Sequence, residues 1–202
     1  MIGIIDYGMG NLRSVENALH HIGEECMISG DVQELEKCGK LILPGVGAFG
    51  DCMANMHQRG LAGPVKNWID QGKPLLGICV GMQMLFEESE EKGIHPGLGV
   101  LKGRIVRMKT DLPVPQIGWN ELEKAKEHPL FASLTPHPYV YYVHSYCAED
   151  YDEADLCGFS MYGDVKVAGL MVRGNLMAAQ FHPEKSGEDG LQILQWFAKE
   201  TV

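Results

Sequence analysis

Short apolar runs alternate with amphipathic stretches over residues 1–88. The apolar runs predict buried strands over residues 2–6, 26–28 and 40–43, and a further strand that Pro74 opens. Apolar residues at helical spacing predict helices over residues 11–22 and along Leu61, Val65, Trp68 and Ile69, with glycines at their ends. This alternation predicts a largely parallel sheet whose carboxyl edge is the place for an active site.

The pattern changes to shorter strands from Gly99 onward. Strands are predicted over residues 100–108, 116–122, 139–147, 156–162, 165–172 and 176–181. Residues 173–175 predict a tight hairpin turn, and residues 187–200 predict a final helix. The glycines and the proline within residues 90–99 predict a loop between the two halves. We therefore expect one α/β domain over residues 1–202, a three-layer sandwich with a more antiparallel C-terminal half.

Composition narrows the functional class without naming a function. The 202 residues are 45% hydrophobic, enough for a sizeable core, and carry 17 basic against 27 acidic residues, a net charge of -10. That charge argues against nucleic acid or anionic membranes as the main ligand. The six cysteines form no CxxC pair, so we expect reduced thiols, no metal and no cofactor. Residues 2–6 are too short for a signal peptide, which predicts a cytoplasmic, unprocessed chain.

Candidate chemistry begins at Cys79, which lies between Gly77 and Gly81. It follows the apolar run at 74–76 and precedes a helix-like stretch over residues 82–88. Small-x-Cys-x-small between a strand and a helix is the cysteine version of the nucleophile elbow, a sharp turn that lifts the reactive atom above the sheet. Glycines are needed there because side chains would collide with neighbouring strands.

A base for this thiol is predicted at His182, because an imidazole favours the reactive thiolate form of a cysteine. Glu184 would project the same way along a segment that Pro183 keeps extended, and could orient the imidazole. Taken singly, Cys79 would equally fit a buried apolar cysteine and His182 a surface turn. Their occurrence together favours a cysteine hydrolase.

These residues resemble a known family. Residues 77–83, Gly-Ile-Cys-Val-Gly-Met-Gln, and 181–184, Phe-His-Pro-Glu, are similar to the class I (triad) glutamine amidotransferases, which release ammonia from glutamine through a cysteinyl thioester. Residues 44–49, 115–120 and 143–146 are similar, more narrowly, to the glutaminase subunits of imidazole glycerol phosphate synthases. The resemblance runs end to end. It departs at Val80, where the class more often carries leucine.

The substrate site can be argued from what amide hydrolysis needs. Two backbone N–H groups should face the oxyanion, one from Val80 and one from the turn at 44–47, near Gly47. Gln83, one helical turn after Cys79, could bind the amino-acid end of glutamine, unless it is simply an exposed helix residue, and the glycines at 45 and 47 could serve only a tight turn. Contacts mainly through the backbone are expected from the segment His144, Ser145 and Tyr146.

The resemblance also implies a partner. The family docks this subunit on a barrel-shaped cyclase as a heterodimer, for which Asn11, Trp119, Tyr141 and Lys185 are our candidate contacts, although a core position fits Trp119 equally well. It implies low glutamine turnover alone and faster turnover with the nucleotide-bound partner.

Two other functions stay open. The chain could serve another synthase, of the pyridoxal phosphate or anthranilate type, or be a non-catalytic redox or binding module of the same fold. A dinucleotide site is not expected, because the glycines at 8 and 10 lack the third glycine of that fingerprint and Arg13 stands in its place.

Overall fold

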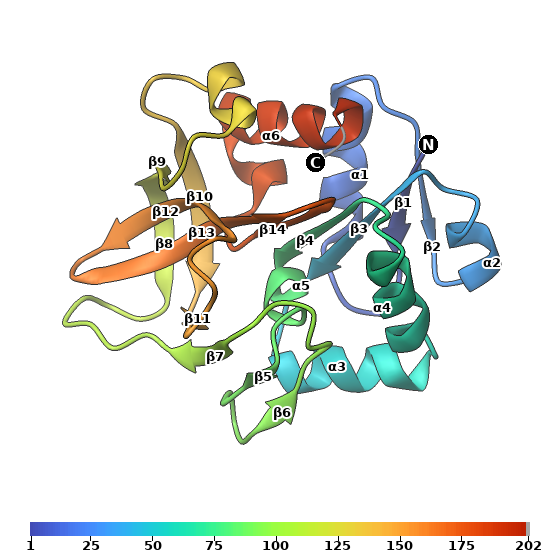
Figure 1. The fold of residues 1–202 in the computed structure, drawn as a ribbon, viewed down its shortest axis with the longest axis horizontal. Coiled ribbons are helices and arrows are strands. Elements are labelled where there is room, and N and C mark those ends of the chain that lie inside the picture. Colours follow the sequence, from blue (N-terminus) through green and yellow to red (C-terminus); the bar gives the residue numbers. More distant parts are fainter. Residues whose placement is uncertain (201–202) are drawn as a thin grey trace.

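A computed structural model describes residues 1–200 and is built on one eight-stranded sheet (Figure 1). Its strand order is β2-β1-β3-β4-β14-β13-β12-β9. The parallel part consists of β1 (Ile2–Ile5), β2 (Cys26–Ser29), β3 (Lys40–Gly45), β4 (Leu75–Cys79) and β14 (Leu176–Ala179). The antiparallel part consists of β13 (Val165–Arg173), β12 (Leu156–Tyr162) and β9 (Glu123–Lys124). The predicted α/β class and the antiparallel C-terminal half are confirmed.

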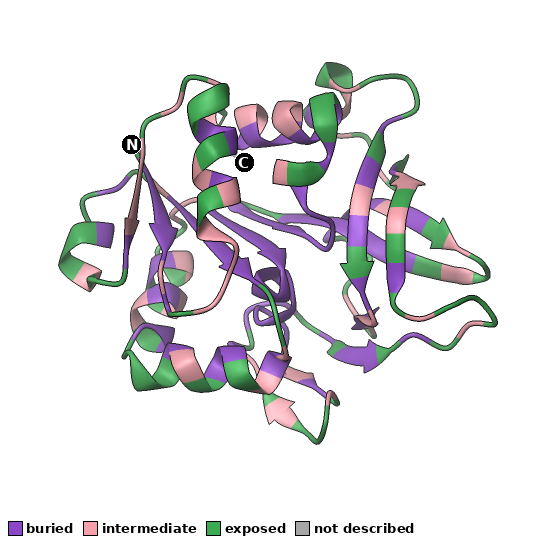
Figure 2. Cartoon of the chain, turned by 180° about the vertical axis from the view of Figure 1, so that it is seen from behind, coloured by how far each residue is buried: buried purple, intermediate pink, exposed green. Residues whose placement is uncertain are grey.

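Helices cover both faces of this sheet. One layer holds α1 (Leu12–His21) and α6 (Gly187–Lys199), and the other holds α3 (Phe49–Gln58) and α4 (Ala62–Asp70) (Figure 1). The short α2 (Val32–Leu35) lies beside the edge strand β2, and two 3₁₀ turns, η1 (Pro129–Ser133) and η2 (Pro183–Lys185), flank α6. Seen from behind, the central strands are almost continuously buried while the helices expose their outer faces (Figure 2). The buried sheet is what holds the site described below in place.

Two smaller sheets complete the fold. Strands β8 (Gln116–Glu121) and β10 (Tyr139–His144) form an antiparallel pair. The second small sheet has the order β11 (Tyr146–Glu149), β7 (Arg104–Arg107), β5 (Glu88–Ser89) and β6 (His95–Pro96). The single strand predicted over residues 139–147 is therefore wrong, because the chain leaves one sheet at His144 and enters another at Tyr146.

The stretch after the elbow also differs from the prediction. The helix expected over residues 82–88 is one turn, α5 (Val80–Gln83), and Glu88 already belongs to β5. Residues 84–86 are fully buried on all sides, and the carbonyls of Met84, Leu85 and Phe86 accept bonds from the N–H groups of residues 98–101. These bonds between two segments of the chain take the place of helical bonds. Because residues 98–101 are engaged in them, the strand predicted from residue 100 begins only at Arg104.

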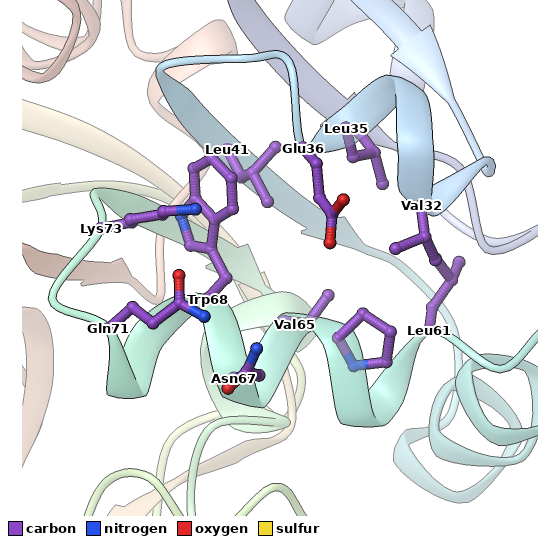
Figure 3. Close-up of a pocket in the computed structure, with 11 residues that line it drawn as sticks. Val32, Leu35, Glu36, Leu41, Leu61, Val65, Asn67, Trp68, Gln71 and Lys73 are labelled. Atoms are coloured by element: carbon purple, nitrogen blue, oxygen red, sulfur yellow. The ribbon is translucent and has the colours of Figure 1, made fainter.

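A small cavity with mixed polar and apolar walls lies between α2 and α4, away from Cys79 (Figure 3). Trp68 forms one wall, and the Lys73 ammonium lies 4.4 Å from the centre of its ring. The cavity holds about 30 Å³, which is room for one water molecule rather than for a metabolite.

Neither a membrane span nor a metal cluster is found within residues 1–200. No helix there is long and apolar enough to cross a membrane. No group of three or more His, Cys, Asp or Glu side chains in that range is placed to hold a metal ion. The six cysteines are all free thiols.

Candidate active site

Cys79 is the last residue of β4 and adopts a backbone conformation that side chains rarely take, with φ 55° and ψ -114°. The backbone packing around it explains the flanking glycines. A Cβ on Gly81 would lie 1.9 Å from the carbonyl oxygen of Leu43, and one on Gly77 would lie 2.9 Å from that of Gly81. A Cβ on Gly45 would lie 2.4 Å from the Gly81 nitrogen. The elbow is therefore locked against β3 by contacts between main chains.

His182 and Glu184 meet at the end of the neighbouring strand β14, whose Ala179 pairs with Ile78 of β4. The Nδ1 atom of His182 lies 2.8 Å from Glu184 Oε1, and the two side chains are only 3% and 1% exposed. The segment is not extended as predicted, because Pro183 begins the 3₁₀ turn η2, which folds Glu184 back onto the imidazole. The His182 Nε2 atom is buried without a hydrogen bond to residues 1–200. That nitrogen is therefore available to exchange a proton with a reacting group in the site.

The environment of His182 favours its protonated form. Burial alone would lower the pKa of His182, but the neighbouring Cys79 and Glu184 outweigh burial and raise that pKa to about 9. The imidazole of His182 is therefore in its doubly protonated, positively charged form near neutral pH. A protonated imidazole beside a cysteine stabilises the thiolate, which is the nucleophilic form.

This balance gives a first prediction. Replacing Cys79 by alanine removes one of the two groups that raise the pKa of His182, so that pKa should fall from about 9 toward its ordinary value of about 6.5 or below. A histidine NMR titration of the two proteins measures the change. Cys157→Ala, which removes another buried thiol, is the control and should leave the titration of His182 as it is. An unchanged pKa in Cys79→Ala would mean that the two side chains do not interact.

A cavity of about 320 Å³ opens above Cys79 at the carboxyl edge of the sheet. The structure brings all the predicted substrate residues to its wall, together with Cys79 and His182, although they come from four separate segments of the chain. It is lined by Val46, Gly47, Cys79, Val80, Gln83, Glu91, Pro115, Val143, His144, Ser145, Tyr146 and His182.

Gln83 is buried, 3% exposed, so the alternative of an exposed helix residue is wrong. Its Nε2 atom donates to the carbonyl oxygen of Tyr146 at 3.0 Å and to Gln180 Oε1 at 2.9 Å. Gln180 in turn lies with its Nε2 atom 4.0 Å from the Cys79 sulfur. Both amide hydrogens of Gln83 are used within the protein, which leaves its oxygen for a ligand.

The structure adds Glu91, which the sequence analysis missed, and gives His144 side-chain contacts where mainly backbone contacts were expected. Glu91 supplies a carboxylate to the cavity wall, and its Oε2 accepts a bond of 2.7 Å from the N–H of Phe49. His144 contacts the Tyr146 carbonyl through Nδ1 at 2.8 Å and Gln116 Oε1 through Nε2 at 2.9 Å. Glu91 lies in a stretch interpreted as a connecting loop, and no local pattern marks it.

The imidazole of His144 differs from that of His182. Burial lowers the pKa of His144 to about 4, opposed by the bond to the Tyr146 carbonyl and helped by the charge of His182. His144 is therefore neutral near pH 7 and serves to hold the wall of the cavity rather than to carry charge.

Three of the four candidate partner residues lie close to one another. Trp119 pairs with Tyr141 across β8 and β10, and their rings lie 5.9 Å apart edge to face. Lys185 is exposed on η2, and a Cβ on Gly187 would lie 3.8 Å from the Trp119 ring. Trp119 is 52% exposed, so the core position considered for it is wrong. Asn11 lies directly before α1, a helix that contacts η2.

Comparison with known proteins gives a consistent result. The family model described as "Glutamine amidotransferase class-I" matches residues 3–201. The imidazole glycerol phosphate synthase subunit HisH of Bacillus cereus (strain G9842) is 52% identical over 98% of this chain and 93% of that protein. The HisH subunit of Sulfurimonas denitrificans is 48% identical, covering 98% of each chain.

Solved structures support the fold alone. A crystal structure of a glutamine amidotransferase superposes with a TM-score of 0.77 at 22% identity, covering 97% of this chain and 96% of the other. PurLQS from Thermotoga maritima gives the same TM-score and coverage at 21% identity. With the family model matching almost the whole sequence, the chain belongs to the class I glutamine amidotransferases.

Proposed function

We propose that this chain is the glutaminase subunit of an imidazole glycerol phosphate synthase. It hydrolyses L-glutamine to glutamate and ammonia, and passes the ammonia to a cyclase subunit that makes imidazole glycerol phosphate and aminoimidazole carboxamide ribotide for histidine biosynthesis in the cytoplasm. Relatives with that subunit name are about half identical to this chain over nearly their whole length. The observation that carries the chemistry is the buried contact between His182 and Glu184 beside Cys79.

In the proposed mechanism the sulfur of Cys79 attacks the side-chain amide carbon of glutamine. His182, oriented through Nδ1 by Glu184, delivers its proton to the leaving nitrogen, and ammonia departs from the thioester. Water then attacks the thioester carbon while His182 accepts the proton of that water. The sulfur is released and glutamate leaves.

Negative charge forms on the amide oxygen in both steps. The N–H of Val80, directly after the nucleophile, is one proposed donor, and the turn at 44–47, which brings Val46 and Gly47 to the cavity, supplies the other. Each donor of this kind contributes roughly 3 kcal/mol to lowering the barrier.

The amino-acid end of glutamine needs groups of both charges. The carboxylate of Glu91 and the free amide oxygen of Gln83 suit the α-ammonium group, since both are acceptors on the cavity wall. Ser145 and Tyr146, where the chain passes from β10 to β11, suit the α-carboxylate through backbone N–H groups.

The exposed face of β8 and β10 is the proposed docking surface for the cyclase. It consists of Ile117, Trp119, Tyr139, Tyr141 and Val143, which alternate on the two paired strands, and four of the five are more than a third exposed. Aromatic residues at such a density are typical of interface anchors. Lys185 and Asn11 are proposed to contribute polar contacts.

A glutaminase assay tests the proposal. Glutamine hydrolysis by the chain alone should be low and should rise at least about tenfold with a cyclase subunit that carries its nucleotide, because coupling between two sites is commonly worth 1–3 kcal/mol. Trp119→Ala should weaken that stimulation by raising the concentration of cyclase needed for half of the effect, by about tenfold or more.

Trp196→Ala is the matched control, because it removes the same side chain from α6. The carbonyl oxygen of the next residue, Phe197, accepts a hydrogen bond from Lys40 Nζ. Because Lys40 begins β3 and the site lies at the carboxyl end of the parallel strands, Trp196 lies away from the site. Hydrolysis without any stimulation by the cyclase would favour a different synthase as partner. A chain without hydrolysis under either condition would favour the non-catalytic module.

A further inference from the structure

Two fully buried side chains outside the proposed triad bind the turn at 44–47. The hydroxyl of Tyr7 donates to the carbonyl oxygen of Pro44 at 2.9 Å. The thiol of Cys52 donates to the carbonyl oxygen of Val46 at 3.5 Å. Tyr7 follows β1 and Cys52 lies in the first turn of α3, so the turn is held from two different elements.

Both groups keep their protons, as these bonds require. Burial, with a smaller contribution from Cys52, raises the pKa of the Tyr7 phenol far above its ordinary value. Burial also raises the pKa of the Cys52 thiol to about 11. Since a carbonyl oxygen can only accept, the phenol and the thiol act as donors throughout the neutral pH range.

The position of the two bonds has a geometric consequence. Within a peptide unit the C=O and the N–H point in opposite directions. Holding the carbonyl of Val46 therefore fixes the direction of the Gly47 N–H, while holding the carbonyl of Pro44 fixes the start of the turn, where Gly45 still pairs with Cys79 of β4. Gly47 has φ +100° and lines the cavity above Cys79, and its freedom would otherwise leave the turn without a defined orientation.

We propose that Tyr7 and Cys52 are positioning residues that hold the 44–47 turn with the N–H of Gly47 directed at the oxyanion. This inference rests on the proposed function, because an oxyanion forms only if the site hydrolyses an amide. The two side chains do not touch the substrate. They act on the transition state through the backbone that they hold.

Steady-state kinetics of glutamine hydrolysis by the cyclase-activated complex tests the inference. Tyr7→Phe and Cys52→Ala should each lower kcat about tenfold and leave KM within about twofold, because a contact made only in the transition state affects kcat alone. Cys52→Ser keeps a donor of nearly the same size and should restore kcat to within about threefold of the unmodified chain.

The chain offers a matched control for each change. The hydroxyl of Tyr162 donates to the carbonyl oxygen of Pro113 at 2.6 Å, and the thiol of Cys38 donates to that of Glu34 at 3.8 Å. None of these four residues lines the cavity. Tyr162→Phe and Cys38→Ala lose the same kind of bond and should keep kcat unchanged.

Alkylation of Cys79 by iodoacetamide, followed by mass spectrometry, provides the second measurement. This reaction forms no tetrahedral oxyanion, so its rate should be the same in Tyr7→Phe, Cys52→Ala and the unmodified chain, which also shows that the variants are folded. Unchanged kcat in both variants, a parallel fall in alkylation, or a Cys52→Ser variant as slow as Cys52→Ala would overturn the inference. If the unmodified complex does not hydrolyse glutamine, the proposed function is wrong as well. If only the inference is wrong, the unmodified complex remains active, so its activity separates the two outcomes.

Discussion

Replacement of Cys79 by alanine is expected to lower glutamine hydrolysis by at least about 10⁴-fold, because the covalent route is lost and only binding and the oxyanion donors remain. The fold should survive. Alanine adopts the φ of 55° at this position as well as cysteine does, and it leaves the packing of Gly77 and Gly81 unchanged. Glutamine turnover by the complex with the cyclase, followed as glutamate release, measures the effect.

The same variant separates the two half-reactions. Synthesis of imidazole glycerol phosphate from added ammonia should persist, since ammonia bypasses the glutaminase site. Cys157→Ala, at a fully buried thiol of β12, is the control for the loss of a buried sulfur and should keep both activities. If Cys79→Ala retained glutamine-dependent synthesis, the nucleophile would have to be a different residue.

Substitution of Gly81 by alanine should be nearly as damaging, for a steric reason. The new methyl group would lie 1.9 Å from the Leu43 oxygen and 2.8 Å from the Leu43 carbonyl carbon, and neither atom belongs to a side chain that can rotate away. Separating β3 from the elbow should cost about 3 kcal/mol. For a domain of this size that cost lowers Tm by roughly 6–12 °C. Glutamine hydrolysis should fall with it, because the elbow moves relative to the 44–47 turn.

Gly63→Ala is the control for this change. Gly63 is exposed within α4, and a Cβ there would meet nothing within 4 Å. Alanine in a helix is favoured over glycine by about 0.5–1 kcal/mol, so this variant should be as stable as the unmodified chain or slightly more so. A Gly81→Ala protein with unchanged Tm and activity would show that the backbone contact at the elbow can relax freely.

Local patterns were sufficient to predict much of the parallel half of the fold. Short apolar runs became β1, β3 and β4, and the stripe from Leu61 to Ile69 became α4, because burial on one or both sides dictates those patterns directly. The elbow glycines were also predictable, since the turn leaves them no alternative. The helix α3 was predictable in principle but missed: its buried residues Phe49, Cys52, Met53 and Met56 have helical spacing.

Other features depend on contacts between distant segments. Residues 139–147 form one continuous apolar pattern, yet they divide between two sheets because β10 pairs with β8 and β11 pairs with β7. Gln116 reaches His144 only through the register of those strands, and Glu91 reaches the cavity from a loop. Contacts of this kind cannot be predicted from the spacing of residues along the chain. The roles of Cys79, His182 and Glu184, and of the partner-facing residues, stay predictions until the variants are measured.

Strand β10 has a consequence for how this protein can evolve. The side chain of Tyr141 lies against Trp119 on the exposed face, while its main-chain oxygen accepts a bond of 2.9 Å from the N–H of His182 and its main-chain N–H donates to Ser186 Oγ at 2.9 Å. Main-chain bonds do not depend on which side chain the residue carries. The side chains on the exposed face of this strand can therefore change during evolution together with the surface of the partner. The main-chain bonds that support His182 are kept through such changes.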